Sequence, residues 1–321
     1  MRSKITSPRR TVLAVPGSNS KMIEKSRNLS ADEILLDLED SVALSQKDTA
    51  RILVSVELNR GGFDSPLIAV RVNEQNKSIG LEDVEYLVKN SGGNFDSLII
   101  PKVESKEQVV DLGIRLSSLE KLSSLPIGSI KVQLQIESAL GLLHASEIAA
   151  ASSRNLSLIF GPGDFAASIG MQVLHLGENP PDYPGDDAYH YALMHILVAA
   201  RAHGLLAIDG PYSAIDNPEG LKNRAHISSS LGFDGKWVIH PSQIEIVNSI
   251  FSPTQKTFDS AAALLIFFEE NQKNDSNASG ALLFEGKMVD MASQKMAEMI
   301  YAKGIAAGLE ISSERKNNDS A

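Results

Sequence analysis

Short apolar runs alternate with longer amphipathic segments along most of the chain. The short runs are dense in Val, Ile and Leu rather than alternating between apolar and polar residues, which is typical of parallel strands covered on both faces. We expect eight strands, at residues 11–15, 33–38, 67–72, 97–101, 131–136, 156–160, 205–209 and 236–239. We expect helices between them, at residues 20–29, 46–58, 81–89, 106–122, 142–151, 189–203 and 218–231, and one after the last strand, at residues 243–250.

This repeated alternation of strand and helix favours a closed (β/α)8 barrel, the TIM-barrel fold, over an open doubly wound α/β sheet, which is the structural alternative. Residues 173–187 interrupt the pattern: they are rich in Pro, Gly and acidic residues and predict a long loop inserted after the sixth strand. After Pro253 come a helix, a polar spacer at residues 271–280 and a second helical stretch at residues 292–302, and we expect residues 314–321 to be disordered. The sequence therefore predicts a catalytic barrel domain at residues 1–253 and a small C-terminal helical subdomain at residues 254–321.

Composition narrows the classes of partner and chemistry. The chain has no cysteine, which excludes disulfide scaffolds, thiolate nucleophiles, iron–sulfur clusters and cysteine-based zinc sites, and fits a cytoplasmic location. Its formal net charge of -10 argues against nucleic acid as the main partner. No apolar run approaches the roughly 20 residues that a membrane-spanning helix needs, so we expect no membrane association.

Two carboxylates follow neighbouring strands of the expected barrel. Glu137 comes directly after the fifth strand and Asp164 soon after the sixth. In a (β/α)8 barrel the chemistry gathers at the carboxyl ends of the strands, and two carboxylates suffice for Mg2+ when substrate oxygens and water complete its octahedron. An ion pair with a lysine or a helix cap would explain either residue alone equally well. Together they predict a magnesium site.

Other polar residues end further strands. Arg71 ends the third strand, where its guanidinium can clamp a carboxylate with two hydrogen bonds, and Glu39 or Asp40 after the second strand would orient it; we expect both interactions. His240, after the last strand, is the histidine that we expect near the site. The residues from Gly161 to Ala166 match the relaxed dinucleotide pattern G-x-G-x-x-A, but no acidic residue ends a strand about 20 residues later. We interpret these glycines instead as allowing the backbone to approach a ligand beside Asp164.

Nine stretches resemble, in order, the HpcH/HpaI aldolase and citrate lyase β-subunit superfamily, and most of all its malyl-CoA and β-methylmalyl-CoA lyases. They are LAVPGS (13–18), LDLEDSV (36–42), AVRVN (69–73), IPKV (100–103), IESA (136–139), DFAAS (164–168), IDGP (208–211), GKWVIHP (235–241) and GKMVD (286–290). The resemblance implies a TIM barrel with Mg2+, or Mn2+ as a substitute, on Glu137 and Asp164, and Arg71 at the oxo-acid end of the substrate.

The resemblance also implies a function for the C-terminal segment. It implies a lid over the site of a neighbouring subunit in a homotrimer or homohexamer, with Asp290 delivered as the acid/base group. Without the resemblance, Asp290 would be interpreted only as the N-cap of the helix that follows it.

The coenzyme A contacts implied by the resemblance fall on the first βα loop and helix. Lys25 stands where a CoA-contacting lysine is expected, and Asn19 is a departure, because some relatives carry arginine there. The resemblance also implies that the backbone around Gly163 and Asp164, and around Ile239 and His240, lines the acyl pocket. Arg9, Arg10 and Lys21 are further cationic candidates for the phosphates.

The expected reaction is the reversible cleavage of (S)-malyl-CoA, and also of β-methylmalyl-CoA or citramalyl-CoA, to acetyl-CoA or propionyl-CoA and a 2-oxo acid such as glyoxylate. The alternatives are a citrate lyase β-subunit acting on a carrier-bound thioester, a CoA-independent 2-oxo-acid aldolase, and a non-catalytic metabolite-binding protein. The stretch IDGPY and the long insertion are closer to the malyl-CoA lyases, which favours free CoA.

Overall fold

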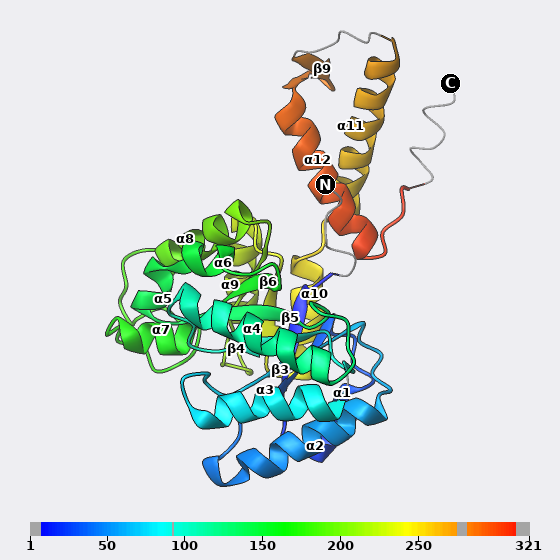
Figure 1. The fold of residues 1–321 in the computed structure, drawn as a ribbon. Helices are drawn as coiled ribbons and strands as arrows, with labels where there is room; N and C mark the ends of the chain where they lie inside the picture. The colour runs from blue at the N-terminus through cyan, green and yellow to red at the C-terminus, as the bar shows by residue number, and fades with distance from the viewer. Residues whose placement is uncertain (1–7, 92, 275–280, 313–321) are drawn as a thin grey trace. The chain divides into compact units, whose positions relative to one another are not determined.

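Eight parallel strands close into a barrel in the computed structural model, which describes residues 8–91, 93–274 and 281–312 (Figure 1). The strands are β1 (Thr11–Pro16), β2 (Glu33–Asp37), β3 (Leu67–Arg71), β4 (Ser97–Ile100), β5 (Lys131–Ile136), β6 (Asn155–Phe160), β7 (Leu206–Asp209) and β8 (Gly235–Val238). Each strand pairs with the next along the chain, and β8 pairs with β1. The expected TIM barrel is confirmed, and the open sheet is excluded.

The helices that alternate with these strands are α1 (Ser20–Ser26), α2 (Lys47–Arg60), α3 (Ser78–Ser91), α4 (Lys106–Leu122), α5 (Ala139–Leu143), α6 (Ala145–Ala150), α7 (Pro162–Ser168), α8 (His190–Ala202), α9 (Pro218–Leu231) and α10 (Ile244–Ile250). In place of the single helix expected at residues 142–151 there are two short helices. The first begins earlier than expected, where Ser138 caps it by accepting the N–H of Gly141 at 3.0 Å. The insertion follows α7 rather than β6, since α7 begins immediately after that strand.

The middle of the barrel is filled by apolar side chains from alternate positions of its strands, including Val12, Leu35, Ile99 and Ile159. These side chains are almost fully buried, so the barrel is a packed core rather than a channel. The packing fixes the strands against one another, and the residues that follow each strand are presented at one end of the barrel.

Glu120 anchors the start of β5, the strand that leads to Glu137. Its buried carboxylate accepts the backbone N–H groups of Gly128 and Ile130 at 2.8 and 2.9 Å and two guanidinium N–H groups of Arg154 at 2.8 and 2.6 Å. Burial by itself would raise the pKa of Glu120, but the hydrogen bonds from Arg154 and the backbone lower it to about 2. The carboxylate is therefore fully ionised near neutral pH.

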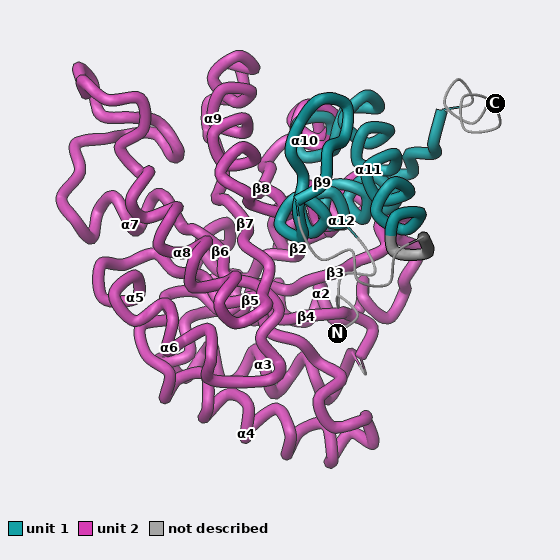
Figure 2. Tube along the Cα trace, turned by 90° about the horizontal axis from the view of Figure 1, so that it is seen from above, with its two compact units in different colours: residues 1–8, 249–321 teal, residues 9–248 magenta. Residues whose placement is uncertain are grey.

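A second compact unit follows the barrel, since the chain divides into Arg9–Asn248 and a unit made of Met1–Pro8 with Ser249–Ala321 (Figure 2). The second unit contains α11 (Gln255–Asn274), the antiparallel pair β9 (Leu282–Phe284) and β10 (Lys287–Val289), and α12 (Met291–Ala306). Phe258 of α11 stacks on Tyr301 of α12 with ring centroids 5.1 Å apart, and Phe267 contacts Phe284 of the hairpin at the same distance.

The hairpin was not expected from the sequence. Glu285 and Gly286 join its strands with φ angles of 48° and 75°, the left-handed conformation that two-residue hairpin turns require. The spacer expected from residue 271 is helical as far as Asn274, and its remainder, like the segment 314–321 expected to be disordered, lies outside the described residues. No helix within the described part of the chain is long and apolar enough to cross a membrane.

We expect Glu120→Gln to destabilise the barrel, because it leaves the Arg154 guanidinium buried without its counter-charge. Removing one partner of a buried ion pair typically lowers the free energy of unfolding by about 3–5 kcal/mol. Urea denaturation followed by circular dichroism measures the loss, and Glu147→Gln, which breaks the exposed pair with Lys106, is the matched control that should leave the midpoint unchanged.

The same ion pair should make stability depend on pH. Since the folded pKa of Glu120 lies below the unfolded value of roughly 4.3, its stabilisation is complete above that value and is lost as pH falls toward about 2. A Glu120→Gln protein with the stability of the wild type would show that the anchor is dispensable.

Candidate active site

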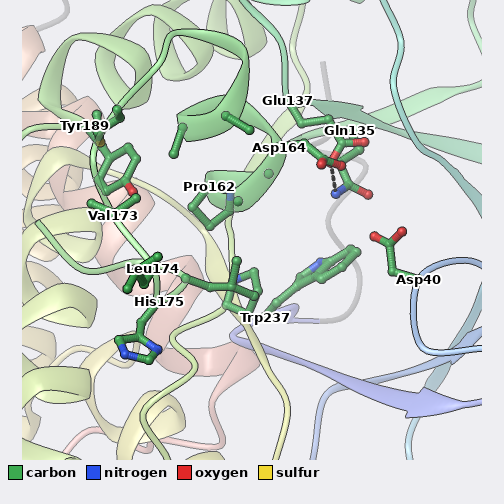
Figure 3. A pocket seen from close by; sticks show the side chains of 17 residues that line it. Asp40, Gln135, Glu137, Pro162, Asp164, Val173, Leu174, His175, Tyr189 and Trp237 are labelled. Carbon is green, nitrogen blue, oxygen red and sulfur yellow. Dashed lines mark hydrogen bonds between the residues drawn. The ribbon is translucent and has the colours of Figure 1, made fainter. Parts of the chain in front are cut away.

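Charged residues from consecutive strands meet at the carboxyl end of the barrel. Glu137 follows β5 and is only 3% exposed, while Asp164 lies in the first turn of α7. The Glu137 carboxylate accepts the backbone N–H of Lys102 at 2.7 Å and the side-chain N–H of Gln135 at 2.6 Å, the contact dashed in Figure 3. Both acidic residues predicted to bind metal therefore lie at one end of the barrel.

Gly161 allows the turn between β6 and α7 to pass close to Glu137. A Cβ atom at this position would lie 2.5 Å from both Cβ and Oε2 of Glu137, so a larger residue would displace the carboxylate. The turn then leads directly to Gly163 and Asp164, which both line the cavity described below.

Arg71 is held by three acidic residues. Its Nε and Nη2 donate to the two carboxylate oxygens of Asp37 at 2.7 Å each, and its Nη1 lies 2.8 Å from Glu39 and 3.4 Å from Asp40. The guanidinium also lies over the Trp237 ring, 5.3 Å from its centroid. The expected interactions with Glu39 and Asp40 are present, but sequence reasoning missed the principal partner, Asp37. The available signal was an acidic residue near the end of the apolar strand that precedes the Arg71 strand, and the structure places the two in register.

Lys102 connects three of the acidic residues. Besides its N–H bond to Glu137, its ammonium donates to Glu39 at 3.0 Å and lies 3.6 Å from Asp164. Its backbone has a φ of 53°, an uncommon value for a residue other than glycine and one that often occurs at functional sites. Lys102 directly follows the strand expected at residues 97–101, and sequence reasoning assigned it no role.

Negative charge exceeds positive charge in this cluster. Burial, and then the charges of Glu39 and Asp164, raise the pKa of Glu137 to about 8. Burial and the neighbouring Asp40 raise the pKa of Glu39 to about 7, although Arg71 and Lys102 oppose the shift. Crowded carboxylates of this kind are stabilised by a cation, and their oxygens are the ligands that Mg2+ prefers.

Few side chains at this end of the barrel are placed to act as metal ligands. In the described ranges there is no group of three or more His, Asp or Glu side chains arranged to hold a metal ion. A cation on Glu137 and Asp164 would therefore need other ligands, such as water or substrate oxygens, to complete six positions.

A cavity of about 460 Å³ opens beside the two carboxylates. Figure 3 shows Glu137 and Asp164 on one side of it and Tyr189 on the other. Three buried polar atoms that line it have no hydrogen-bond partner among the described residues: Gln135 Oε1, Trp237 Nε1 and the Tyr189 hydroxyl oxygen. The sequence analysis missed all three residues. Only Gln135 left a signal, because it lies two residues before Glu137 on the same face of the chain.

The residues expected to contact CoA divide into two groups. Lys25 and Lys21 are exposed on α1, and Asn19 caps that helix by accepting the N–H of Met22 at 3.1 Å. Placing Arg9 and Arg10 among the phosphate contacts was wrong. Both precede β1 and so lie at the opposite end of the barrel from Glu137, where they pair with Glu33, the first residue of β2, and with Asp32, which precedes that strand.

Ile239 and His240 follow β8 at the same end of the barrel as the acidic cluster. The Ile239 N–H donates to the side chain of Gln243 at 2.9 Å, and the exposed His240 ring lies 2.8 Å from the Ser242 hydroxyl and caps the short helix at Pro241–Gln243. Neither residue lines the cavity beside Glu137. Their contact with an acyl group stays a prediction.

Asp290 belongs to the second unit and is exposed. It accepts the N–H groups of Ala292 and Ser293 at 3.0 Å each, so its expected role as the N-cap of α12 is confirmed. The backbone hydrogen bond from Ser293 lowers the pKa of Asp290. Its expected part in catalysis stays a prediction.

The barrel sequence matches the model of the HpcH/HpaI aldolase/citrate lyase family over residues 10–241. The chain belongs to this family. The resemblance drawn from the nine stretches is thereby confirmed, and the chain is an acyl-CoA/oxo-acid lyase of the citrate lyase β family. This excludes the alternative of a non-catalytic metabolite-binding protein.

Three relatives illustrate the range of the family. The L-malyl-CoA/β-methylmalyl-CoA lyase of Cereibacter sphaeroides is 34% identical over 91% of this chain and 93% of its own length. The citrate lyase subunit β of Haemophilus influenzae is 35% identical over 92% of this chain and 96% of its own. The crystal structure of CitE from Mycobacterium tuberculosis with magnesium, acetoacetate and coenzyme A superimposes with a TM-score of 0.69 at 28% identity, over 92% of this chain and 98% of that one.

The raised pKa of Glu137 predicts that cation binding depends on pH. Glu137 must lose its proton before both its oxygens can bind a cation, so the affinity for Mg2+ should rise about tenfold per pH unit below the pKa and level off above it. That plateau should begin near pH 8, the pKa of about 8 in the metal-free protein. Isothermal titration calorimetry over this pH range measures both the affinity and the protons released.

Glu137→Gln and Asp164→Asn should each weaken Mg2+ binding, and Glu137→Gln should also remove the pH dependence. Glu219→Gln, which alters an exposed carboxylate paired with Lys222, is the matched control. A Mg2+ affinity that does not change with pH would contradict the prediction.

Proposed function

We propose that the protein reversibly cleaves (S)-malyl-CoA, and related thioesters such as β-methylmalyl-CoA and citramalyl-CoA, to acetyl-CoA or propionyl-CoA and a 2-oxo acid such as glyoxylate. The observation that carries the proposal is the pair Glu137 and Asp164 at the edge of a cavity at the carboxyl end of the barrel. The similarity to the malyl-CoA lyase of Cereibacter sphaeroides supports the choice of substrate.

Glu137 and Asp164 would hold Mg2+, with Mn2+ as a substitute. The fit rests on the chemistry of these residues: both offer carboxylate oxygens, and neighbouring negative charge disfavours ionised Glu137 in the absence of a cation. When bound, the ion supplies a Lewis acid that polarises the C2 oxygen of the substrate. CitE from Mycobacterium tuberculosis, which has been crystallised with magnesium, supports this assignment.

Arg71 supplies a fixed positive charge at the oxo-acid end. Asp37 and the Trp237 ring hold its guanidinium in one orientation, so little reorganisation is needed when charge moves onto the substrate oxygens. Lys102 adds a second positive charge beside Glu39 and Asp164. Loss of the C2 hydroxyl proton and cleavage of the C2–C3 bond leave a 2-oxo acid and a thioester enolate, and the enolate carbon must then be protonated.

Asp290 is the acid/base group that we assign to this proton transfer. It protonates the enolate carbon during cleavage and removes a methyl proton during condensation. In our proposal the C-terminal unit covers the site of a neighbouring subunit in a homotrimer or homohexamer, and this closure excludes water.

The thioester would be free CoA, bound along α1 by Lys25 and Lys21 near Asn19, with the acyl end beside the backbone of Gly163, Ile239 and His240. The exposure of both lysines leaves their ammonium groups available to phosphates. The CitE complex with coenzyme A supports free CoA as well. A cytoplasmic location, expected from the absence of cysteine, stays a prediction.

A carrier-bound thioester is the second candidate, because the citrate lyase subunit β of Haemophilus influenzae is as similar as the malyl-CoA lyase. A CoA-independent aldolase would use the same carboxylate pair but would have no need for the lysines of α1. Both alternatives predict that free acetyl-CoA is not consumed.

The decisive measurement is an assay of purified protein with Mg2+, acetyl-CoA or propionyl-CoA, and a series of 2-oxo acids, with the acyl-CoA products separated by liquid chromatography. We expect malyl-CoA from acetyl-CoA and glyoxylate, and loss of the product with EDTA. If neither thioester is consumed with any 2-oxo acid, the proposal is wrong and the two alternatives remain.

Asp290→Asn separates catalysis from capping. Asparagine caps a helix as well as aspartate does, so α12 should keep its stability, while the acid/base group is lost. We expect kcat to fall by about 100-fold or more, within the range typical of general acid/base groups, with Mg2+ affinity unchanged. Asn217→Asp, an exchange in the opposite direction at the cap of α9, serves as the control. Unchanged turnover in Asp290→Asn would leave Asp290 as a cap only.

A further inference from the structure

The cavity beside Glu137 has an apolar half that glyoxylate would leave empty. Its lining includes Ala166 and Ala167 of α7, Val173, Leu174, His175 and Leu176 of the insertion, and Tyr189. Figure 3 shows Val173, Leu174 and Tyr189 on the side opposite Glu137. Leu174 is 96% exposed at the rim, so a ligand that covered it would bury apolar surface that now faces water.

The polar groups of this half are the buried Tyr189 hydroxyl and the exposed His175 ring. Tyr189 is 1% exposed, its ring packs edge-on against Phe160 at 5.6 Å, and its hydroxyl has no hydrogen-bond partner in the described part of the chain. A buried hydroxyl without a partner costs free energy, and one that lines a cavity can recover it by bonding to a ligand.

No free charge faces Tyr189 from its charged neighbours. The Arg224 guanidinium lies 5.5 Å from the ring centroid, but it is already paired with Asp187 at 2.6 Å. A charged ligand group at the hydroxyl would therefore find no unpaired counter-charge on Arg224 or Asp187.

We propose that this apolar half is a side-chain subsite for 2-oxo acids with an aliphatic chain of about three carbons or more that ends in a neutral hydrogen-bonding group such as a hydroxyl. This inference rests on the proposed function, in which Glu137 and Asp164 hold the oxo-acid end. The chain of the acid then extends along Ala167, Leu174 and Leu176, and Tyr189 bonds to its terminal polar atom.

We assign the chain to the oxo acid from the position of the proposed phosphate contacts of CoA. The proposed CoA contacts lie on α1, after β1, whereas α7, the insertion and Tyr189 follow β6. In the closed barrel β1 and β6 are not neighbours, since β7 and β8 separate them on one side. A group that extends from the carboxylate pair toward Tyr189 therefore points away from α1.

The test compares 2-oxo acids of increasing length as partners of acetyl-CoA. The series is glyoxylate, pyruvate, 2-oxobutanoate, 2-oxopentanoate and 5-hydroxy-2-oxopentanoate, with 2-oxoglutarate as the charged counterpart. We expect kcat/KM to be maintained or to rise with chain length, and the hydroxylated acid to exceed 2-oxopentanoate by roughly 3–10-fold, the value of one hydrogen bond. The charged acid should be the poorest of the longer substrates.

Two variants with matched controls test the subsite itself. Tyr189→Phe should bring the ratio of the hydroxylated acid to 2-oxopentanoate to about one, whereas Tyr191→Phe, which alters an exposed tyrosine on the same helix, should keep the wild-type ratio. Ala167→Leu fills the apolar half and should lower the ratio of 2-oxopentanoate to glyoxylate by about tenfold or more, whereas Ala150→Leu at an exposed helical position should not.

A wild-type protein that turns over glyoxylate but rejects every longer acid overturns the subsite while leaving the proposed function intact. So does a Tyr189→Phe variant that keeps the wild-type ratio. If no acid reacts with acetyl-CoA, the proposed function fails, and calorimetric binding of the same acids to the Mg2+-loaded protein tests the subsite instead. Affinity that rises with chain length and depends on Tyr189 then supports it, and affinity independent of both overturns it.

Discussion

The site depends first on the ion pair between Arg71 and Asp37. Two hydrogen bonds of 2.7 Å join a guanidinium and a carboxylate that are both almost completely buried at the mouth of the barrel. Burial alone would raise the pKa of Asp37, but the charge and hydrogen bonds of Arg71 hold it below its usual range. Each charge offsets the desolvation cost of the other at this depth. The pair therefore fixes a positive charge among carboxylates that would otherwise repel one another.

Around this pair the structure distributes the remaining charge unevenly. Lys102 neutralises part of Glu39 and donates a backbone N–H to Glu137, yet Glu137 retains a pKa of about 8 because burial and its acidic neighbours outweigh that donor. A raised carboxylate pKa marks a position where a cation would be stabilised. The same barrel end thus combines fixed cations with acidic residues that are only partly neutralised.

The side of the cavity opposite the carboxylates is mostly apolar. There the lining comes from small residues of α7 and from mostly apolar residues of the insertion, and the polar groups are the Tyr189 hydroxyl and the His175 ring. Charged chemistry requires a polar, preorganised environment, whereas discrimination between substrates by length requires a wall of defined shape. By joining α7 to a long insertion, the chain provides both in one cavity, with Gly161 bringing the turn close to Glu137.

The periodicity and residue types of the sequence were sufficient to predict the barrel. A parallel strand covered on both faces must be apolar, and a chain of eight such strands separated by helices can form few folds. The same features were also sufficient for Glu137, Asp164 and Arg71, since the carboxyl ends of the strands share one end of the barrel. They failed where a residue's role depends on which partner it meets. Arg9 and Arg10 were misplaced because residues close in sequence to the first βα loop can still lie at the opposite end of its strand.

Asp37, Lys102, Gln135, Tyr189 and Trp237 gained their roles only in three dimensions. Register across β2 and β3 sets Asp37 against Arg71, and the fold leaves the Tyr189 hydroxyl and the Trp237 N–H in the cavity wall without partners in the described residues. The sequence by itself determined the strands, the end of the barrel where chemistry gathers and the pair of carboxylates there. The tertiary structure decided which charges are paired and which polar atoms are left for a ligand, because both depend on distances between side chains that are far apart along the chain.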